Sequence, residues 1–200
     1  MLGLPGSTKV NKRLPKKIIY TKFQMNTAAK EKMDANISRI TIVNELSPDK
    51  INIAEGEQIQ TFFVVLVILK RKDFDAWTIT TLSKLISQNM LFVLEYGDDA
   101  KLALYHTKLM QTPWLSKDEL TMPIKGLNLD TVWENIIIHI GGVKIENGNT
   151  LDKQIAIDDK RNKLKMEINR LDKRARKEKQ PRKKFELVQE IHQLKKKLEG

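Results

Sequence analysis

The sequence predicts an α+β domain with a mainly antiparallel sheet and two packed helices, followed by a C-terminal α-helical hairpin. Short apolar segments of strand length fill the middle of the chain, and two amphipathic helical patterns interrupt them. The last quarter repeats apolar residues at coiled-coil spacing. We therefore divide the 200 residues into a basic N-terminal arm (1–32), an α+β domain (33–150) and a basic helical hairpin (151–200).

The first elements are short. Glycines and prolines scattered through residues 1–22 argue against a regular helix there, whereas good helix formers predict a short helix at Thr27–Met33. Residues 37–43 and 51–53 then place isoleucines among polar residues, and Ser47-Pro48-Asp49 predicts a turn between them.

The strongest strand is Ile59–Leu69. Its core reads FFVVLVIL, which is apolar on both faces, so we expect a central strand covered on both sides. A helix begins at Asp73 or Asp75, either of which can cap it, and continues to about Gln88. Its apolar stripe consists of Ile79, Leu82, Leu85 and Ile86.

A β-hairpin and a second helix complete the predicted domain. Met90–Tyr96 and Lys101–Lys108 flank the turn Gly97-Asp98-Asp99, and the second of these segments alternates cleanly. Residues 109–125 are irregular, with one more short strand expected near Trp114. The second helix begins after Asn128 or Asp130 and continues to Ile140, where Gly141 and Gly142 stop it.

The C-terminal segment carries two apolar seams on either side of a proline. Ile157, Leu164, Ile168, Leu171 and Ala175 lie seven, four, three and four residues apart, and Leu187, Ile191, Leu194 and Leu198 repeat at four, three and four. Because a proline inside a helix removes a hydrogen bond and clashes with the preceding turn, Pro181 breaks the pattern. We favour an antiparallel hairpin; the alternative is one long kinked helix that dimerises with a second chain.

Charge is distributed very unevenly along the chain. Residues 1–32 hold eight Lys/Arg and one acid, residues 33–152 hold eleven and sixteen, and residues 153–200 hold seventeen and eight. The net charge of +11 therefore belongs to the two ends. Two cationic ends on an acidic middle indicate a protein that binds a polyanion or an acidic partner.

Several classes of function have no support in the sequence. The chain lacks cysteine, which excludes disulfides and thiolate sites, and its longest apolar run of eight residues is too short to cross a membrane. Residues 1–17 contain no apolar signal-peptide core, so we expect a cytoplasmic protein. Glycine-rich phosphate loops and the nucleophile motif G-x-S-x-G are absent, and we expect no cofactor and no metal.

One enzymatic alternative stays open. His106, His139 and His192 are too far apart in the chain to form a metal-binding pair. A divalent-metal-dependent nuclease would need an acid on one strand and Asp/Glu-x-Lys on the next, and the nearest match is Asp75 with Asp99 and Lys101. Asp99 falls in the expected turn, where aspartate is favoured for backbone reasons.

Basic residues at both ends are the candidate nucleic-acid contacts. They would bind phosphates with little sequence specificity, because no recognition helix accompanies them. The candidates are Lys9, Lys12, Arg13, Lys16 and Lys17 in the arm, and Arg174, Arg176, Lys177, Lys179, Arg182, Lys183 and Lys184 at the hairpin turn.

The apolar seams are a second candidate interface. Two isolated helices of about 20 residues bury little area, so the α+β domain or another protein could complete their seam. The candidate partner-docking residues are Leu164, Ile168, Leu171, Leu187, Ile191, Leu194 and Leu198.

The whole chain also resembles a bacterial family, a domain of unknown function. The resemblance rests on GLPGSTKVNKRLPKKIIY, LSPDKINIAEGEQIQTFFVVLVIL, LFVLEY, GLNLDTVWENII and KEKQPRKKFELVQEIHQLKKKL. Members of that family are often encoded beside helicases and DNA methyltransferases of restriction or phage-defence systems. The resemblance thus implies an accessory subunit with a helicase- or methyltransferase-type partner, and it supplies no active-site residues. It draws attention to Asn11, Lys12, Lys16, Lys17, Lys179, Gln180 and Lys183.

We therefore expect a non-catalytic accessory protein that docks onto a partner protein, DNA or RNA through its basic ends. Two alternatives remain, the nuclease described above and an RNA- or ribosome-associated binding factor.

Overall fold

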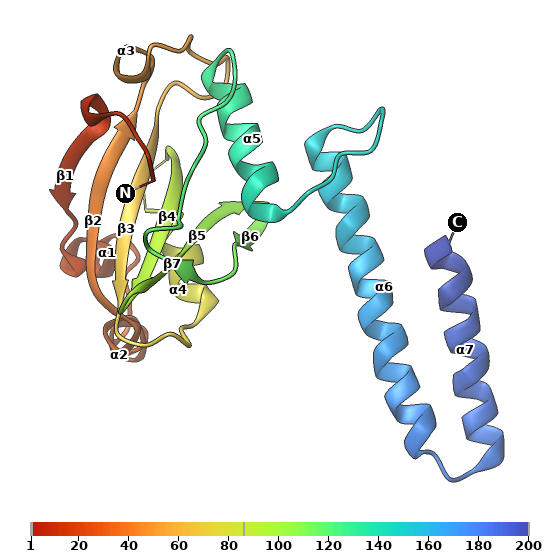
Figure 1. The fold of residues 1–200 in the computed structure, drawn as a ribbon. Coiled ribbons are helices and arrows are strands. Elements are labelled where there is room, and N and C mark those ends of the chain that lie inside the picture. The colour runs from red at the N-terminus through yellow and green to blue at the C-terminus, as the bar shows by residue number, and fades with distance from the viewer. Residues whose placement is uncertain (1, 86, 200) are drawn as a thin grey trace. The chain divides into compact units, whose positions relative to one another are not determined.

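A computed structural model describes residues 2–85 and 87–199 (Figure 1). The chain forms two compact units, one that ends at Gly142 and one that begins at Val143. The first, the sheet unit, holds a mixed seven-stranded sheet with helices, and the second, the hairpin unit, holds two packed helices. The α+β prediction with a C-terminal helical hairpin is confirmed.

The strands lie in the order β1-β2-β3-β4-β5-β6, with β7 beside β5. β3 and β4 are parallel because a crossover containing a helix joins them, whereas the other neighbours pair antiparallel. The strands are β1 (Lys9–Arg13), β2 (Ile37–Leu46), β3 (Phe62–Leu69), β4 (Asn89–Tyr96), β5 (Asp99–His106), β6 (Lys108–Gln111) and β7 (Leu115–Ser116).

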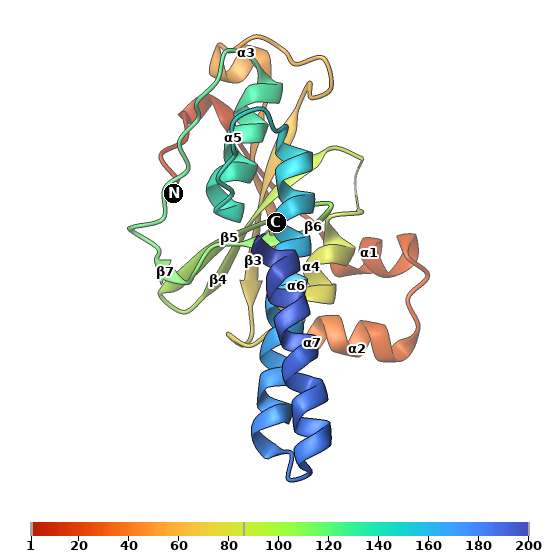
Figure 2. The ribbon, with the colours of Figure 1, turned by 90° about the vertical axis from the view of Figure 1, so that its right-hand side faces the viewer.

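The helices of the sheet unit cover both faces of the sheet (Figures 1 and 2). Side chains alternate along β3, so Val65 and Val67 contact a cluster that includes Ile19, Met33 and Ile79 from three different helices. These helices are α1 (Lys16–Lys22), α2 (Thr27–Asn36) and α4 (Ala76–Leu82), while α3 (Pro48–Ile51) is a single turn after β2.

The opposite face of the sheet packs against α5 (Leu129–Gly141). Phe62 of β3 and Trp133 of α5 place their ring centroids 5.2 Å apart, and both side chains are buried. β3 is therefore covered on both sides, as its doubly apolar sequence predicts. Asn128 caps α5 by accepting a hydrogen bond from the backbone N–H of Thr131, and Gly142 ends the helix at φ 61°.

The N-terminal region differs from the prediction. Residues 16–22 form a regular helix, α1, which the prolines and glycines of this region argued against. Pro15 directly precedes the first turn, where its missing N–H and fixed φ cost nothing, so it starts the helix. Lys9–Arg13 is the edge strand of the sheet and pairs with β2, and a turn of 3-10 helix (Gly6–Thr8) precedes it.

Three further boundaries differ. α4 ends at Leu82 and not near Gln88, because a tighter turn follows in which the N–H of Leu85 bonds to the carbonyl of Leu82. Ile86, the last residue of the predicted apolar stripe, lies outside the described residues. Asp99 is the first residue of β5, opposite Tyr96. β6 follows β5 through a turn at Thr107, which adopts φ 55°.

The hairpin unit contains α6 (Leu151–Lys177) and α7 (Pro181–Glu199), which pack together along the predicted seam (Figure 1). Thr150 caps α6, and residues 178–180 form the connection. The two helices belong to one chain and run antiparallel, so the prediction of a hairpin is confirmed. Leu171, Ala175 and Ile191 are its buried centre.

Candidate nucleic-acid interface

The turn between α6 and α7 gathers basic side chains at one end of the hairpin unit. The N–H of Glu178 bonds to the carbonyl of Arg174 (3.0 Å), and the Glu178 carboxylate accepts from the N–H of Gln180 (2.8 Å). Pro181 then starts α7. We call residues 174–184 the hairpin tip. Its basic residues are Arg174, Arg176, Lys177, Lys179, Arg182, Lys183 and Lys184, and all of them are exposed.

Most of these cations have no ion-pair partner among residues 2–85 and 87–199. Arg176 pairs with Asp172 (2.8 Å) and Arg182 with Glu186 (3.4 Å), and both arginines remain largely exposed. The other five form no ion pair with any described residue. The tip therefore presents an uncompensated positive charge to solvent.

The positive side chains at the start of α7 are electrostatically unfavourable for the helix. Arg182, Lys183 and Lys184 occupy its first turn, which holds no acidic residue. Because the N-terminus of a helix carries a partial positive charge, each such cation destabilises the helix by about 0.3–1 kcal/mol. The stability of α7 therefore does not explain why these basic residues stand at its start, whereas the binding of an external anion would explain it.

One aromatic side chain accompanies the tip and was not predicted as a site. Phe185 is 62 % exposed directly after Lys184, and Val188 is exposed one turn further along α7. Phe185 lies two residues before Leu187 of the seam, which places it on the far side of the helix. The two-residue offset from the apolar seam is the sequence feature that could have identified Phe185 as an exposed aromatic residue.

The N-terminal basic residues divide into two kinds. Lys9, Lys12 and Arg13 lie on the edge strand β1, and they are exposed, as is Lys17 on α1. Lys16 instead donates to the Asp34 carboxylate (2.6 Å) and to the carbonyl of Ile37 (2.6 Å). The ammonium of Lys16, a predicted nucleic-acid contact, is therefore already engaged in hydrogen bonds inside the sheet unit.

Tyr20 completes this internal cluster. Its hydroxyl donates to the same oxygen of Asp34 (2.6 Å), so two donors converge on one carboxylate. The bond from Lys16, followed by the bond from Tyr20, lowers the pKa of Asp34, and burial together with the neighbouring Asp34 raises the pKa of Tyr20. The cluster ties α1 to α2 and is structural.

Five of the seven predicted docking residues lie in the apolar cluster between the two helices of the hairpin. Leu171 and Ile191 are buried, and Ile168, Leu187 and Leu194 pack against them. Leu164 and Leu198 are half-buried. The hairpin thus covers much of its own seam, and docking through these residues stays a prediction.

The residues of the nuclease alternative each have other contacts. Asp75 caps α4 through the N–H of Trp77 (2.7 Å) and pairs with Lys32 (2.6 Å), and the bond from Lys32 lowers its pKa. Asp99 pairs with Lys72. Among the described residues, no group of three or more His, Cys, Asp or Glu side chains could hold a metal ion.

Lys101 forms no ion pair with any described residue and lies over two aromatic rings. Its ammonium lies 4.8 Å from the ring centroids of both Phe74 and Trp114, and Lys72 lies 5.4 Å from the same Trp114 ring. Burial lowers the pKa of Lys101. The two rings stabilise the cation in place of a carboxylate.

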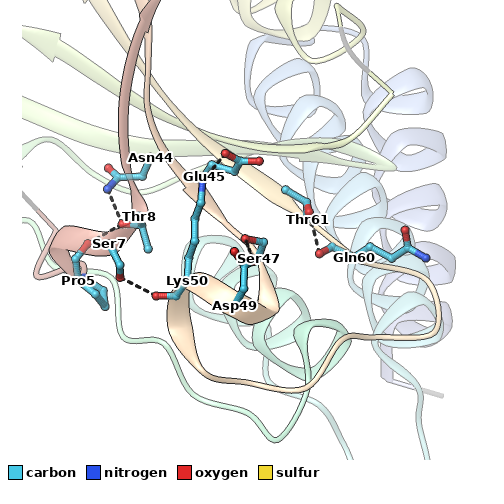
Figure 3. A network of polar contacts seen from close by, with 10 residues as sticks. All are labelled: Pro5, Ser7, Thr8, Asn44, Glu45, Ser47, Asp49, Lys50, Gln60 and Thr61. Atoms are coloured by element: carbon cyan, nitrogen blue, oxygen red, sulfur yellow. Dashed lines mark hydrogen bonds and ion pairs between the residues drawn. The ribbon is translucent and has the colours of Figure 1, made fainter.

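A polar network fixes the N-terminus onto β2 and α3 (Figure 3). The Ser7 hydroxyl donates to the carbonyl of Lys50 (2.6 Å), and the buried Asn44 amide donates to the Thr8 hydroxyl (2.7 Å). Lys50 also pairs with Glu45. The Thr8 hydroxyl donates to the carbonyl of Pro5 (2.7 Å), so these bonds hold residues 5–8 against β2 and α3.

Comparison with known proteins identifies a family for this chain but no individual relative. No helix among residues 2–85 and 87–199 combines the length and apolar character that a membrane crossing requires. A search of curated proteins and a search of solved structures each returned no match. One family model matches residues 2–198, and the chain therefore belongs to the family described as "Domain of unknown function (DUF4391)".

Proposed function

We propose that this protein is a non-catalytic nucleic-acid-binding factor that contacts phosphates through its hairpin tip. The observation that carries the proposal is the set of five exposed cations at the tip without an ion-pair partner among the described residues. Two of the seven are arginines that could switch from a carboxylate on their own helix to a phosphate.

The physical basis is counterion release. Each Lys or Arg that neutralises a phosphate frees a condensed cation from the nucleic acid, so binding is steeply salt-dependent and weakly sequence-dependent. The tip carries flexible side chains and no array that could read base edges. Exposed Phe185 adds one aromatic face on which an unpaired base could stack, which favours single strands over duplexes.

The resemblance noted from the sequence suggests the setting. An accessory subunit of a DNA-processing or phage-defence system would bring nucleic acid to a helicase or methyltransferase that performs the catalysis. The basic tip is compatible with this role, and it is equally compatible with an RNA-associated factor. Both nucleic acids are therefore candidate ligands.

The test is a titration of the full chain with single- and double-stranded DNA and RNA at two salt concentrations. We expect salt-dependent binding that the triple variant K179E/K183E/K184E weakens. The slope of log K against log salt should become shallower by about 0.9 for each duplex phosphate that this variant leaves without a cation. The matched control is K160E/K163E/K165E, which reverses three exposed charges on α6 away from the tip.

Two results would contradict the proposal. Equal weakening by both triple variants would show a diffuse effect of net charge and no role for the tip. Absence of binding to all four nucleic acids at the lower salt concentration would exclude nucleic-acid contact altogether. Preference for RNA would select the RNA-associated alternative.

A further inference from the structure

The helices α1 and α4 form a surface whose chemistry differs from that of the hairpin tip. A hollow of about 600 Å³ lies on α1 and is lined by Pro15, Lys17, Ile18, Thr21 and Lys22. Ile18 of α1 is 53 % exposed in it. Ile18 therefore gives this hollow an exposed apolar side chain.

A second hollow of about 390 Å³ lies between the α1–α2 connection and α4. Its lining includes Phe23, Met25, Trp77 and Lys84, and Trp77 is 39 % exposed. Consecutive residues Lys22 and Phe23 line one hollow each, and Lys22 donates to the carbonyl of Leu85, next to Lys84. The two hollows are therefore neighbours.

The charged residues that line the two hollows have one sign. Among the described residues that line them are three lysines, Lys17, Lys22 and Lys84, and no acid. Lys17 and Lys84 form no ion pair with any described residue. An occupant must therefore supply apolar side chains for two adjacent hollows and negative charge for the lysines beside them.

From this complementarity we infer that the α1–α4 surface, the two hollows together, docks an acidic amphipathic segment of a partner protein. A nucleic acid would satisfy the lysines but would leave Ile18 uncovered, since an aliphatic side chain gives a base little to stack on. A helix with apolar residues on one face and carboxylates beside them satisfies both. The inference goes beyond the proposed function and concerns a different unit of the chain.

The test uses the full chain and a fluorescent peptide of about 16 residues, with Leu or Phe at positions i, i+3, i+4 and i+7 and Glu between them. A scrambled peptide of identical composition serves as its control. We expect the amphipathic peptide to bind and the scrambled one not to. I18S and W77S should each weaken binding at least about tenfold, as for residues central to an interface.

Matched variants separate this surface from general effects. K17E should weaken peptide binding and reduce its salt dependence, whereas K125E, the same charge change on the exposed loop before α5, should not. F185S replaces a comparably exposed apolar residue in the hairpin unit and should leave peptide binding unchanged. Circular dichroism confirms that each variant is folded.

Either of two outcomes overturns the inference: equal binding of the amphipathic and scrambled peptides, or binding that is insensitive to both I18S and W77S. Displacement of the peptide by an oligonucleotide from the wild type and from F185S alike would assign the surface to nucleic acid instead. None of these results bears on the hairpin tip, whose variants lie in the other unit.

Discussion

The Asp130 side chain occupies the space beside Gly56 that any other residue at position 56 would need. Its two carboxylate oxygens accept hydrogen bonds from the backbone N–H groups of Glu57, Gln58 and Ile59, at 2.8–3.3 Å. A Cβ on Gly56 would lie 2.8 Å from the backbone N of Asp130 and closer still to its carboxylate. The start of α5 thereby holds the loop that leads into β3.

The first prediction follows from this contact. D130A should lower the free energy of unfolding by about 1–3 kcal/mol, because three N–H groups lose their acceptor. G56A should cost a similar amount through steric conflict. Thermal or denaturant unfolding measures both, and E134A, an exposed change on the same helix, should stay within about 0.5 kcal/mol. An unchanged D130A would show that water replaces the carboxylate at no cost in stability.

The second prediction concerns acid stability. The folded state lowers the pKa of Asp34 below its ordinary value of about 3.9, so the ionised form stabilises the fold above that pH and the contribution disappears as pH falls through the lowered pKa. Between about pH 5 and pH 2, the wild type should therefore lose more stability than D34N. D118N, at an exposed position, should follow the wild type. Parallel curves for wild type and D34N would contradict the assignment.

The third prediction concerns Lys101. Because burial lowers its pKa, the folded state favours the neutral amine, and stability should rise as pH increases from the lowered pKa toward about 10.4. K101M should remove this rise and change stability at neutral pH by less than about 1 kcal/mol, since methionine keeps the contact with Phe74 and Trp114. K72M is the control, because it removes a neighbouring lysine that pairs with Asp99 but keeps Lys101, so the rise should remain.

The fourth prediction tests the hairpin unit. L171A should cost about 2–5 kcal/mol of local stability, because it leaves a cavity beside Ile191. M166A changes a 72 % exposed residue on the same helix and should have almost no effect. Hydrogen exchange of the α6 and α7 amides measures the local stability of the hairpin unit separately from that of the sheet unit. Equal exchange in both variants would mean that the seam does not hold the hairpin together.

Local patterns in the sequence predict most of the regular elements. The doubly apolar stretch before Lys70 gives β3, the alternation around Gly97 gives the β4–β5 pair, and the spacing from Leu164 to Leu198 gives the hairpin. Each is a short-range signal that depends on period and turn chemistry alone.

Elements that depend on distant contacts could not be predicted in this way. β1 is a polar edge strand that exists because it pairs with β2, and its five residues show no apolar alternation. Lys16 and Lys17 are the same residue type at adjacent positions, yet only Lys16 donates a hydrogen bond to Asp34. The hollow beside Trp77 depends on how the α1–α2 connection, α2 and α4 meet, which no spacing within one helix reveals.

The bulge in β1 also determines how this sheet can grow. Between Lys9 and Lys12 the strand carries an extra residue relative to β2, and Asn11 adopts φ 48° there. A kinked outer strand with three exposed cations is a poor template for a strand from another copy, which would have to match the kink and approach like charges. Lateral polymerisation and fibril formation through this edge are therefore disfavoured, and a variant that straightens the strand and removes its charges should aggregate from it first.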